Sequence, residues 1–196
     1  MRALLLAAGL GTRLRPLTNT VPKCLVEING RPLIDHWMEL FYKSDISEVL
    51  INLHYLPEQV KAYVSSCTYP SQITTVMENR LLLTGGTLLK NRAFFKRDPI
   101  MMIHADNLSL FDMQAFMDRF YKRADNIDIT MMTFHTDAPQ TCGIVELDAQ
   151  GAVIAFHEKV KTPPSNLANA AVYILAPKVI DFMAGLGKEV LDFSTE

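Results

Sequence analysis

Residues 3–11 read ALLLAAGLG, a continuous apolar run that ends in two glycines separated by a leucine. Six apolar residues in a row, with no polar residue between them, are typical of a strand that is covered on both faces. The glycines allow a tight loop directly after that strand. The sequence therefore predicts a central strand in a mostly parallel sheet, with a loop at its carboxyl end.

The rest of the chain alternates between helical and strand patterns. Helices are predicted over 32–42, 57–64, 86–95 and 111–121, and strands over 48–53, 73–77 and 100–104. Later strands are predicted over 127–134, 143–147, 153–158 and 170–175, with a hairpin turn at Gln150-Gly151. These later strands are too short for a core of their own, so we expect them at the edge of the same sheet. The prediction is one α/β domain with two halves, about 1–125 and 126–196.

Length and composition exclude several classes of protein. The chain has 196 residues, of which 49% are hydrophobic and 20% charged, and its net charge is −2. These values are those of one globular domain, and they provide no broad basic surface for nucleic acid or an anionic membrane. An anionic ligand must therefore be held locally.

The cysteines and the N-terminus indicate a cytoplasmic protein. Cys24, Cys67 and Cys142 are odd in number and far apart, so neither a disulfide framework nor a zinc site is indicated. The N-terminus resembles the start of a signal peptide, but its apolar run is short, and Arg13 and Arg15 follow where a cleavage site would lie. No stretch approaches the ~18 apolar residues that a membrane-spanning helix needs.

The loop after the first strand carries positive charge. Residues 9–18 read GLGTRLRPLT, and Lys23 follows shortly after. Backbone N–H groups near glycines can cradle phosphate oxygens, and Arg13 and Lys23 supply the cations that a triphosphate needs. A dinucleotide-binding fingerprint requires a third glycine where this chain has Leu14, and the Gly-Lys-Ser/Thr of a Walker loop is absent. Both of these common phosphate loops are therefore disfavoured.

The whole loop resembles the signature of the sugar-1-phosphate nucleotidyltransferases, which join an NTP to a sugar 1-phosphate and release pyrophosphate. Five further segments resemble that family in the same order: LTGG at 83–86, HAD at 104–106, GIVE at 143–146, EK at 158–159 and NAAVY at 169–173. The resemblance is strongest to mannose-1-phosphate guanylyltransferases and N-acetylmuramate-1-phosphate uridylyltransferases. It implies a Rossmann-like three-layer sandwich with a GT-A-like, mostly parallel mixed sheet, and a transferase of nucleotide-sugar biosynthesis for cell-envelope polysaccharide.

The resemblance also implies roles for particular residues. Nucleotide binding falls to Ala8, Gly9, Gly11, Thr12, Arg13, Lys23, Glu78, Thr84 and Gly85. Sugar binding falls to Gly143, Glu158, Lys159 and Asn169. The catalytic set is Arg13, Lys23, Asp106 and Lys159, in which Lys159 holds the sugar phosphate.

Asp106 follows the strand 100–104, at the edge of the sheet where ligands of such folds bind. A carboxylate is a ligand that Mg²⁺ prefers, and the resemblance makes Asp106 the metal ligand. We expect a sugar-phosphate oxygen to attack the α-phosphorus directly, because a phosphate monoester is already a nucleophile. Arg13, Lys23 and Mg²⁺ would then stabilise the charge on the triphosphate.

Glu158 and Lys159 are neighbours at the end of a predicted strand. Neighbouring side chains on a strand point to opposite faces, so both can enter one site only if the chain bends there. The family usually continues with proline, whereas this chain has Val160.

Glu78 lies six residues before Thr84, where related uridylyl- and thymidylyltransferases often carry glutamine. A carboxylate accepts hydrogen bonds and so matches the adjacent N–H donors of guanine. The expected substrates are therefore GTP and mannose 1-phosphate. UTP or dTTP with another sugar 1-phosphate, such as N-acetylmuramate or heptose 1-phosphate, stays open, as does assembly into a homo-oligomer.

The family usually supplies a second metal aspartate in a C-terminal Asp-Ile-Gly-Thr-like segment, which this sequence lacks. The surroundings of Asp192 do not resemble that segment. Because residues 192–196 read like the middle of an element, we expect the chain to lack its last few dozen residues.

Three other functions compete with the enzyme. A non-catalytic relative that senses nucleotide sugars would tolerate loss of Arg13, Lys23 or Asp106, and all three are present. A phosphocholine cytidylyltransferase would need only the N-terminal motif, and the sugar-side segments argue against it. An oligomerisation module has no need of a glycine loop with two spaced cations.

Overall fold

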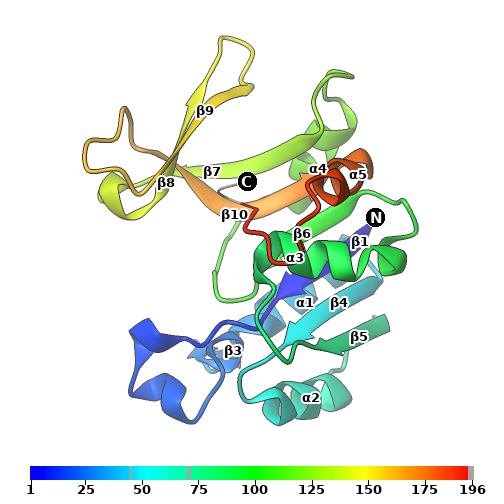
Figure 1. Ribbon diagram of the computed structural model, residues 1–196. Coiled ribbons are helices and arrows are strands. Elements are labelled where there is room, and N and C mark those ends of the chain that lie inside the picture. Colours follow the sequence, from blue (N-terminus) through cyan, green and yellow to red (C-terminus); the bar gives the residue numbers. More distant parts are fainter. Residues whose placement is uncertain (45, 70–71, 194–196) are drawn as a thin grey trace.

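The computed structural model describes residues 1–44, 46–69 and 72–193. Its centre is an eight-stranded sheet in the order β5-β4-β1-β6-β10-β8-β9, with β7 paired to β10 (Figure 1). The first four strands of this sheet, in chain order, are β1 (Arg2–Leu6), β4 (Glu48–Leu53), β5 (Gln72–Met77) and β6 (Ile100–His104). The later strands are β7 (Ile129–His135), β8 (Gly143–Leu147), β9 (Val153–Glu158) and β10 (Leu167–Leu175).

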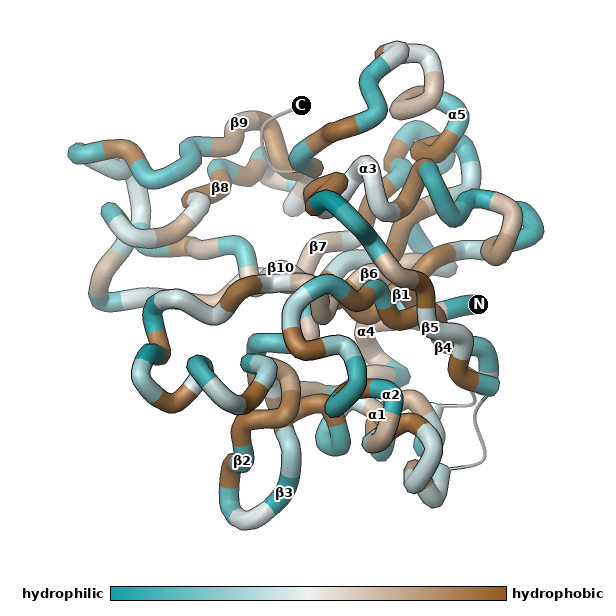
Figure 2. The backbone as a smooth tube through the Cα atoms, turned by 60° about the horizontal axis from the view of Figure 1, so that its bottom comes forward, coloured by the Kyte–Doolittle hydropathy of each residue, from teal (hydrophilic) through white to brown (hydrophobic). Residues whose placement is uncertain are grey.

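The apolar run at the N-terminus forms the central strand, as predicted. β1 lies between β4 and β6 and is parallel to both. Ala3, Leu4 and Leu5 have no exposed surface. Hydrophobic residues gather along β1 and β6 in the middle of the molecule (Figure 2).

Helices cover both faces of the sheet. The helices are α1 (Leu33–Lys43), α2 (Pro57–Ser66), α3 (Leu83–Lys90), α4 (Met113–Tyr121) and α5 (Lys178–Gly185). Ala3 and Leu5 pack into one core with residues of α1, α2 and α4. Leu4, on the opposite face, packs into a second core with residues of α3 and α5. This alternation confirms the predicted three-layer sandwich.

The later strands join the same sheet, as predicted, and do so in antiparallel fashion. β10 pairs with β6 over Val172–Leu175 and with β8 at Ala168, and it pairs with β7 over residues 167–175. β8 and β9 form a hairpin whose turn includes Gly151 at φ +81°, a conformation that favours glycine. The register between β7 and β10 shifts between Asn169 and Tyr173, so β10 carries an irregularity there.

Most element boundaries agree with the sequence analysis, and one differs in a way that matters for the site. The predicted helix 86–95 is α3, which begins three residues earlier, followed by a separate 3-10 turn, Arg92–Phe95. Asn91 closes α3 by donating from Nδ2 to the carbonyl of Thr87 at 2.8 Å. A two-stranded hairpin, β2 (Glu27–Ile28) with β3 (Arg31–Pro32), stands outside the main sheet. No helix in the described part of the chain is long and apolar enough to cross a bilayer.

Candidate nucleotide and sugar sites

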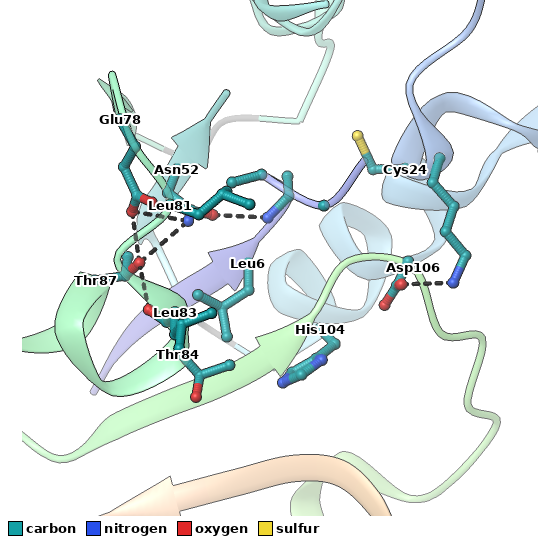
Figure 3. Close-up of a pocket in the computed structure, with 14 residues that line it drawn as sticks. Leu6, Cys24, Asn52, Glu78, Leu81, Leu83, Thr84, Thr87, His104 and Asp106 are labelled. Atoms are coloured by element: carbon teal, nitrogen blue, oxygen red, sulfur yellow. Dashed lines mark hydrogen bonds and ion pairs between the residues drawn. The ribbon is translucent and has the colours of Figure 1, made fainter. Parts of the chain in front are cut away.

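A pocket opens where the parallel strands end, at the carboxyl edge of the sheet (Figure 3). Its lining includes Ala8 and Gly9 from the loop after β1, Lys23, and Asp106 from the loop after β6. Parallel strands bring their carboxyl ends to one edge, which is why segments far apart in the sequence meet here. Five of the nine residues predicted for the nucleotide therefore line one pocket, together with the predicted metal ligand Asp106; the five are Ala8, Gly9, Lys23, Glu78 and Thr84.

The glycine loop has two different reasons for its two glycines. Gly11 has φ +64°, a conformation that favours glycine, and a Cβ there would lie only 3.0 Å from Cγ2 of Thr18. Both the backbone conformation and the lack of space therefore require glycine. Thr18 fixes the turn by donating from Oγ1 to the carbonyl of Gly11 at 2.7 Å. Gly9 faces open space, so its missing side chain leaves backbone accessible at the edge of the pocket.

The structure does not place every predicted loop residue on the pocket. Thr12 and Arg13 form a 3-10 turn, Thr12–Leu14, that is outside the lining. The Arg13 side chain is exposed. Lys23 therefore supplies a positive charge in the lining of the pocket, whereas Arg13 lies on an exposed part of the loop.

Lys23 and Asp106 form an ion pair at the pocket. Lys23 Nζ lies 2.5 Å from Asp106 Oδ2, and the side chains are 29% and 34% exposed. Two residues from different loops thus place a cation and a carboxylate together at the end of β6. Among the residues that the structure describes, no three His, Cys, Asp or Glu side chains gather as a metal-binding cluster.

Cys24 and His104 lie beside this pair. Burial raises the pKa of the Cys24 thiol to about 12, so the thiol is neutral. Burial also lowers the pKa of His104, which favours the neutral imidazole despite the nearby Asp106 carboxylate. The structure places both residues against the pocket.

Glu78 stands at the back of the pocket but is only 2% exposed. Its Oε1 accepts from Thr87 Oγ1 at 2.5 Å and from Asn52 Nδ2 at 3.0 Å (Figure 3). Its Oε2 accepts from the backbone N–H of Leu82 at 3.2 Å. Asn52 Oδ1 in turn accepts from the N–H of Ala7 at 2.7 Å. Both carboxylate oxygens thus have partners within the protein, so Glu78 helps to fix the wall of the pocket, and its contact with guanine stays a prediction.

The Thr84-Gly85-Gly86 turn is built differently from the expectation. Thr84 lines the pocket, whereas the N–H groups of Gly85 and Gly86 donate to the carbonyl of Leu191 at 2.9 and 3.0 Å. A Cβ on Gly85 would overlap the Leu191 side chain, and one on Gly86 would lie 2.5 Å from the carbonyl oxygen of Glu189. The backbone N–H of Gly85 therefore has a partner within the protein, and Gly85 is not in the lining of the pocket, so its contact with the nucleotide stays a prediction.

Sequence reasoning missed the partner of this turn. Residues 189–193 cross the start of α3, and Leu191 bonds the backbone of Leu82, Gly85 and Gly86. The pair of glycines inside a helix was the available signal, because glycine weakens a helix unless another backbone approaches closely.

The sugar-side residues Gly143, Glu158 and Lys159 come together at one corner of the β8–β9 hairpin. Gly143 pairs with Glu158 across the hairpin, and a Cβ on Gly143 would lie 2.8 Å from Glu158 Oε2 and 2.5 Å from Cζ of Phe156. Lys159 has φ +47°, and its N–H donates to the carbonyl of Cys142 at 3.2 Å. This left-handed residue is the bend that the sequence analysis required, and it lets Lys159 Nζ form an ion pair with Glu158 Oε1.

Asn169 stabilises the irregularity in β10. Its Nδ2 donates to the hydroxyl of Tyr173 at 2.5 Å, and its Oδ1 accepts from the N–H of Ala171 at 2.8 Å. Ala171 has φ +56°, so the amide supports a left-handed residue in the strand. Burial raises the pKa of Tyr173, and the charge of Glu158 contributes in the same direction. Asn169, Glu158 and Lys159 are not in the lining of the pocket described above. The residues predicted for the sugar therefore form a set separate from those predicted for the nucleotide.

Comparison with known proteins agrees with this arrangement. The sequence model of the family described as nucleotidyl transferase matches residues 2–194. A mannose-1-phosphate guanylyltransferase of Mycobacterium tuberculosis is 31% identical over 180 residues, which cover 91% of this chain and 50% of that protein. A mannose-1-phosphate guanyltransferase of Saccharomyces cerevisiae is 32% identical over 191 residues, covering 93% and 52% respectively. This chain thus spans about half the length of these relatives.

Solved structures share the fold. HddC from Yersinia pseudotuberculosis in complex with GMP-PN superimposes with a TM-score of 0.81 at 22% identity, covering 100% of this chain and 84% of that one. A UDP-glucose pyrophosphorylase in complex with UDP-glucose gives a TM-score of 0.78 at 20% identity, covering 96% and 82%. Because the family match extends over nearly the whole sequence, the chain belongs to the nucleotidyl transferase family.

Proposed function

We propose that this protein transfers a nucleotidyl group from an NTP to a sugar 1-phosphate, with GTP and mannose 1-phosphate as the favoured pair. The observation that carries the proposal is the Lys23–Asp106 ion pair, 2.5 Å apart at the pocket beside the open backbone of Gly9. A triphosphate needs a cation and accessible N–H groups, and a carboxylate at the same place suits a divalent metal.

Mg²⁺ fits the residues present. Asp106 offers a partly exposed carboxylate at the pocket, and the phosphates of the substrates would supply further oxygen ligands. When bound, Mg²⁺ would offset the negative charge of the triphosphate. Lys23 forms an ion pair with the same carboxylate, so it holds Asp106 in place. Its ammonium would add a second positive charge beside the leaving pyrophosphate.

The sugar phosphate would act as the nucleophile. One of its oxygens forms a bond to the α-phosphorus of the NTP, and the bond between the α-phosphorus and the bridging oxygen breaks to release pyrophosphate. Lys159 is a candidate for holding the incoming phosphate, because its ammonium lies at the bend after β9 together with Glu158, which would accept from sugar hydroxyls. Arg13, on the exposed turn beside the glycine loop, would contact the outer phosphates.

The choice of base has separate support. The names of the relatives, which are guanylyltransferases, support GTP as the substrate of this chain. The buried carboxylate of Glu78 supports a rigid wall behind the base, whichever base is bound. UTP or dTTP with another sugar 1-phosphate is the alternative.

The test is pyrophosphate release in the presence of Mg²⁺, measured for four NTPs against a set of sugar 1-phosphates. Turnover with GTP and mannose 1-phosphate is expected, and it should disappear in Asp106→Ala. Turnover with UTP or dTTP would support transfer but contradict the GTP preference. Absence of turnover in every combination, both in this chain and in one extended by the C-terminal segment with the family's second metal aspartate, would contradict the enzyme. Binding of a nucleotide sugar by calorimetry would then support a sensing protein.

A further inference from the structure

The segment 189–193, here called the strap, is not used by the proposed reaction. It crosses the start of α3 and passes towards β10 (Figure 1). Leu191 at its centre is only 2% exposed. At its outer end, Glu189 forms an ion pair with Arg80 at 2.5 Å.

Four hydrogen bonds join the strap to residues 82–86, here called the nucleotide turn. The N–H of Leu191 donates to the carbonyl of Leu82 at 3.1 Å, and the Leu191 carbonyl accepts from both glycines of the turn. The N–H of Phe193 donates to Thr84 Oγ1 at 2.8 Å. Thr84 lines the nucleotide pocket, so the strap contacts a pocket residue directly.

The same strap reaches the sugar-side strand. The Phe193 ring packs against the ring of Tyr173, with centroids 5.2 Å apart and an interplanar angle of 69°. The Tyr173 hydroxyl accepts from Asn169 Nδ2, and Asn169 Oδ1 holds the N–H of Ala171. A continuous series of contacts therefore runs from Thr84 through Phe193 and Tyr173 to the irregularity in β10.

We propose that Phe193 is a positioning residue that couples the nucleotide turn to the sugar-side strand, so that binding of one substrate favours binding of the other. The coupling rests on the proposed function, whereas the physical link does not. Phe193 is suited to this role because its backbone N–H bonds Thr84 while its ring bears on Tyr173. An element that contacts both sites can transmit order from one to the other when binding restricts its motion.

The first experiment measures hydrogen exchange in the free protein. In Phe193→Ala, the amide of Ala171 should exchange about tenfold faster than in the wild type, because the support of Tyr173 is lost. Phe193→Tyr, which keeps a ring, should restore slow exchange. Phe182→Ala is the matched control, since Phe182 is 66% exposed on α5. Unchanged exchange at Ala171 in a folded Phe193→Ala protein would overturn the proposal.

The second experiment measures nucleotide dissociation constants by calorimetry, using a non-hydrolysable NTP analogue with and without sugar 1-phosphate. In the wild type the sugar phosphate should lower the dissociation constant about fivefold or more. In Phe193→Ala this factor should fall towards one, while each single affinity changes less than the coupling. An equal factor in both proteins, or none in the wild type, would overturn the proposal. If no NTP is turned over, the proposed function fails, and the exchange experiment still decides whether the link exists.

Discussion

At the scale of single residues, the site depends on charges placed together before any substrate arrives. Lys23 and Asp106 are 83 positions apart in sequence and share a bond of 2.5 Å. Both side chains are about one-third exposed, so the pair adds little to stability. In the reaction that we propose its role would be catalytic, because preorganised charges need no rearrangement when charge develops.

Replacing either partner should therefore lower the rate without unfolding the protein. We expect Asp106→Asn and Lys23→Met each to reduce kcat/KM by about 10²–10³-fold, with thermal unfolding nearly unchanged. Asp118→Asn is the control, since Asp118 forms an exposed surface pair with Lys122. Steady-state kinetics and calorimetric melting would check this, and full activity in either site variant would contradict the assigned roles.

Cys24 should be chemically inert in the folded protein. Its pKa of about 12 lies four units above pH 8, so about one thiol in 10⁴ is ionised there, and the thiolate is the reactive form. Iodoacetamide at pH 8 should modify the partly exposed Cys67 and Cys142 and leave Cys24 unmodified until the protein is denatured. Peptide mass spectrometry would report the sites, and equal native labelling of all three cysteines would contradict the burial.

At the scale of elements, a buried polar network joins four pieces of structure behind the nucleotide pocket. Glu78 follows β5, Asn52 lies on β4, Ala7 follows β1 and Thr87 lies on α3, and hydrogen bonds of 2.5–3.0 Å connect them. A buried network of this kind is stable only when every member is satisfied. It fixes the relative positions of three strand ends and one helix.

Glu78→Gln should disturb this network although it keeps the shape of the side chain. The new amide would place N–H donors opposite the N–H of Leu82, which loses its acceptor. We expect a loss of about 1–3 kcal/mol in the free energy of unfolding. Glu58→Gln is the matched control because the Glu58 side chain is 81% exposed. Urea denaturation would measure both, and equal stabilities would show that the Glu78 bonds contribute nothing.

The hairpin corner gives a second test at this scale. In Gly143→Ala, the new Cβ would lie 2.5 Å from Phe156 and 2.8 Å from Glu158, so one of these side chains must move. We expect a loss of about 1–3 kcal/mol in stability and a higher KM for the sugar 1-phosphate. Gly185→Ala is the control, because a Cβ there meets nothing within 4 Å. An unchanged KM would argue against a sugar contact at Glu158.

At the scale of the whole molecule, the sequence predicted the elements better than their long-range contacts. The strands 48–53, 100–104, 143–147 and 153–158 were predicted with their observed bounds, because apolar patterns and turns are local. The place of Asp106 at the edge of the sheet followed from the rule that parallel strands end together, whereas its ion pair with Lys23 was not predicted. The strap could not be predicted, since Leu191 meets Gly85 across more than 100 residues. The hydrogen bonds of Glu78 to Asn52, Leu82 and Thr87 were missed for the same reason, because the burial of Glu78 depends on the assembled sheet.

The arrangement of the two halves accounts for the division of labour that we propose. Parallel strands present one edge to the nucleotide, and the antiparallel strands β8, β9 and β10 carry the sugar-side residues beside it. The measurement that tests this most directly follows the α-phosphorus, by incubating GTP labelled there with ³²P together with mannose 1-phosphate and Mg²⁺. The label should move into the nucleotide sugar with one pyrophosphate released for each transfer. Label found in free GMP, bound to the protein or left wholly in GTP would contradict direct transfer.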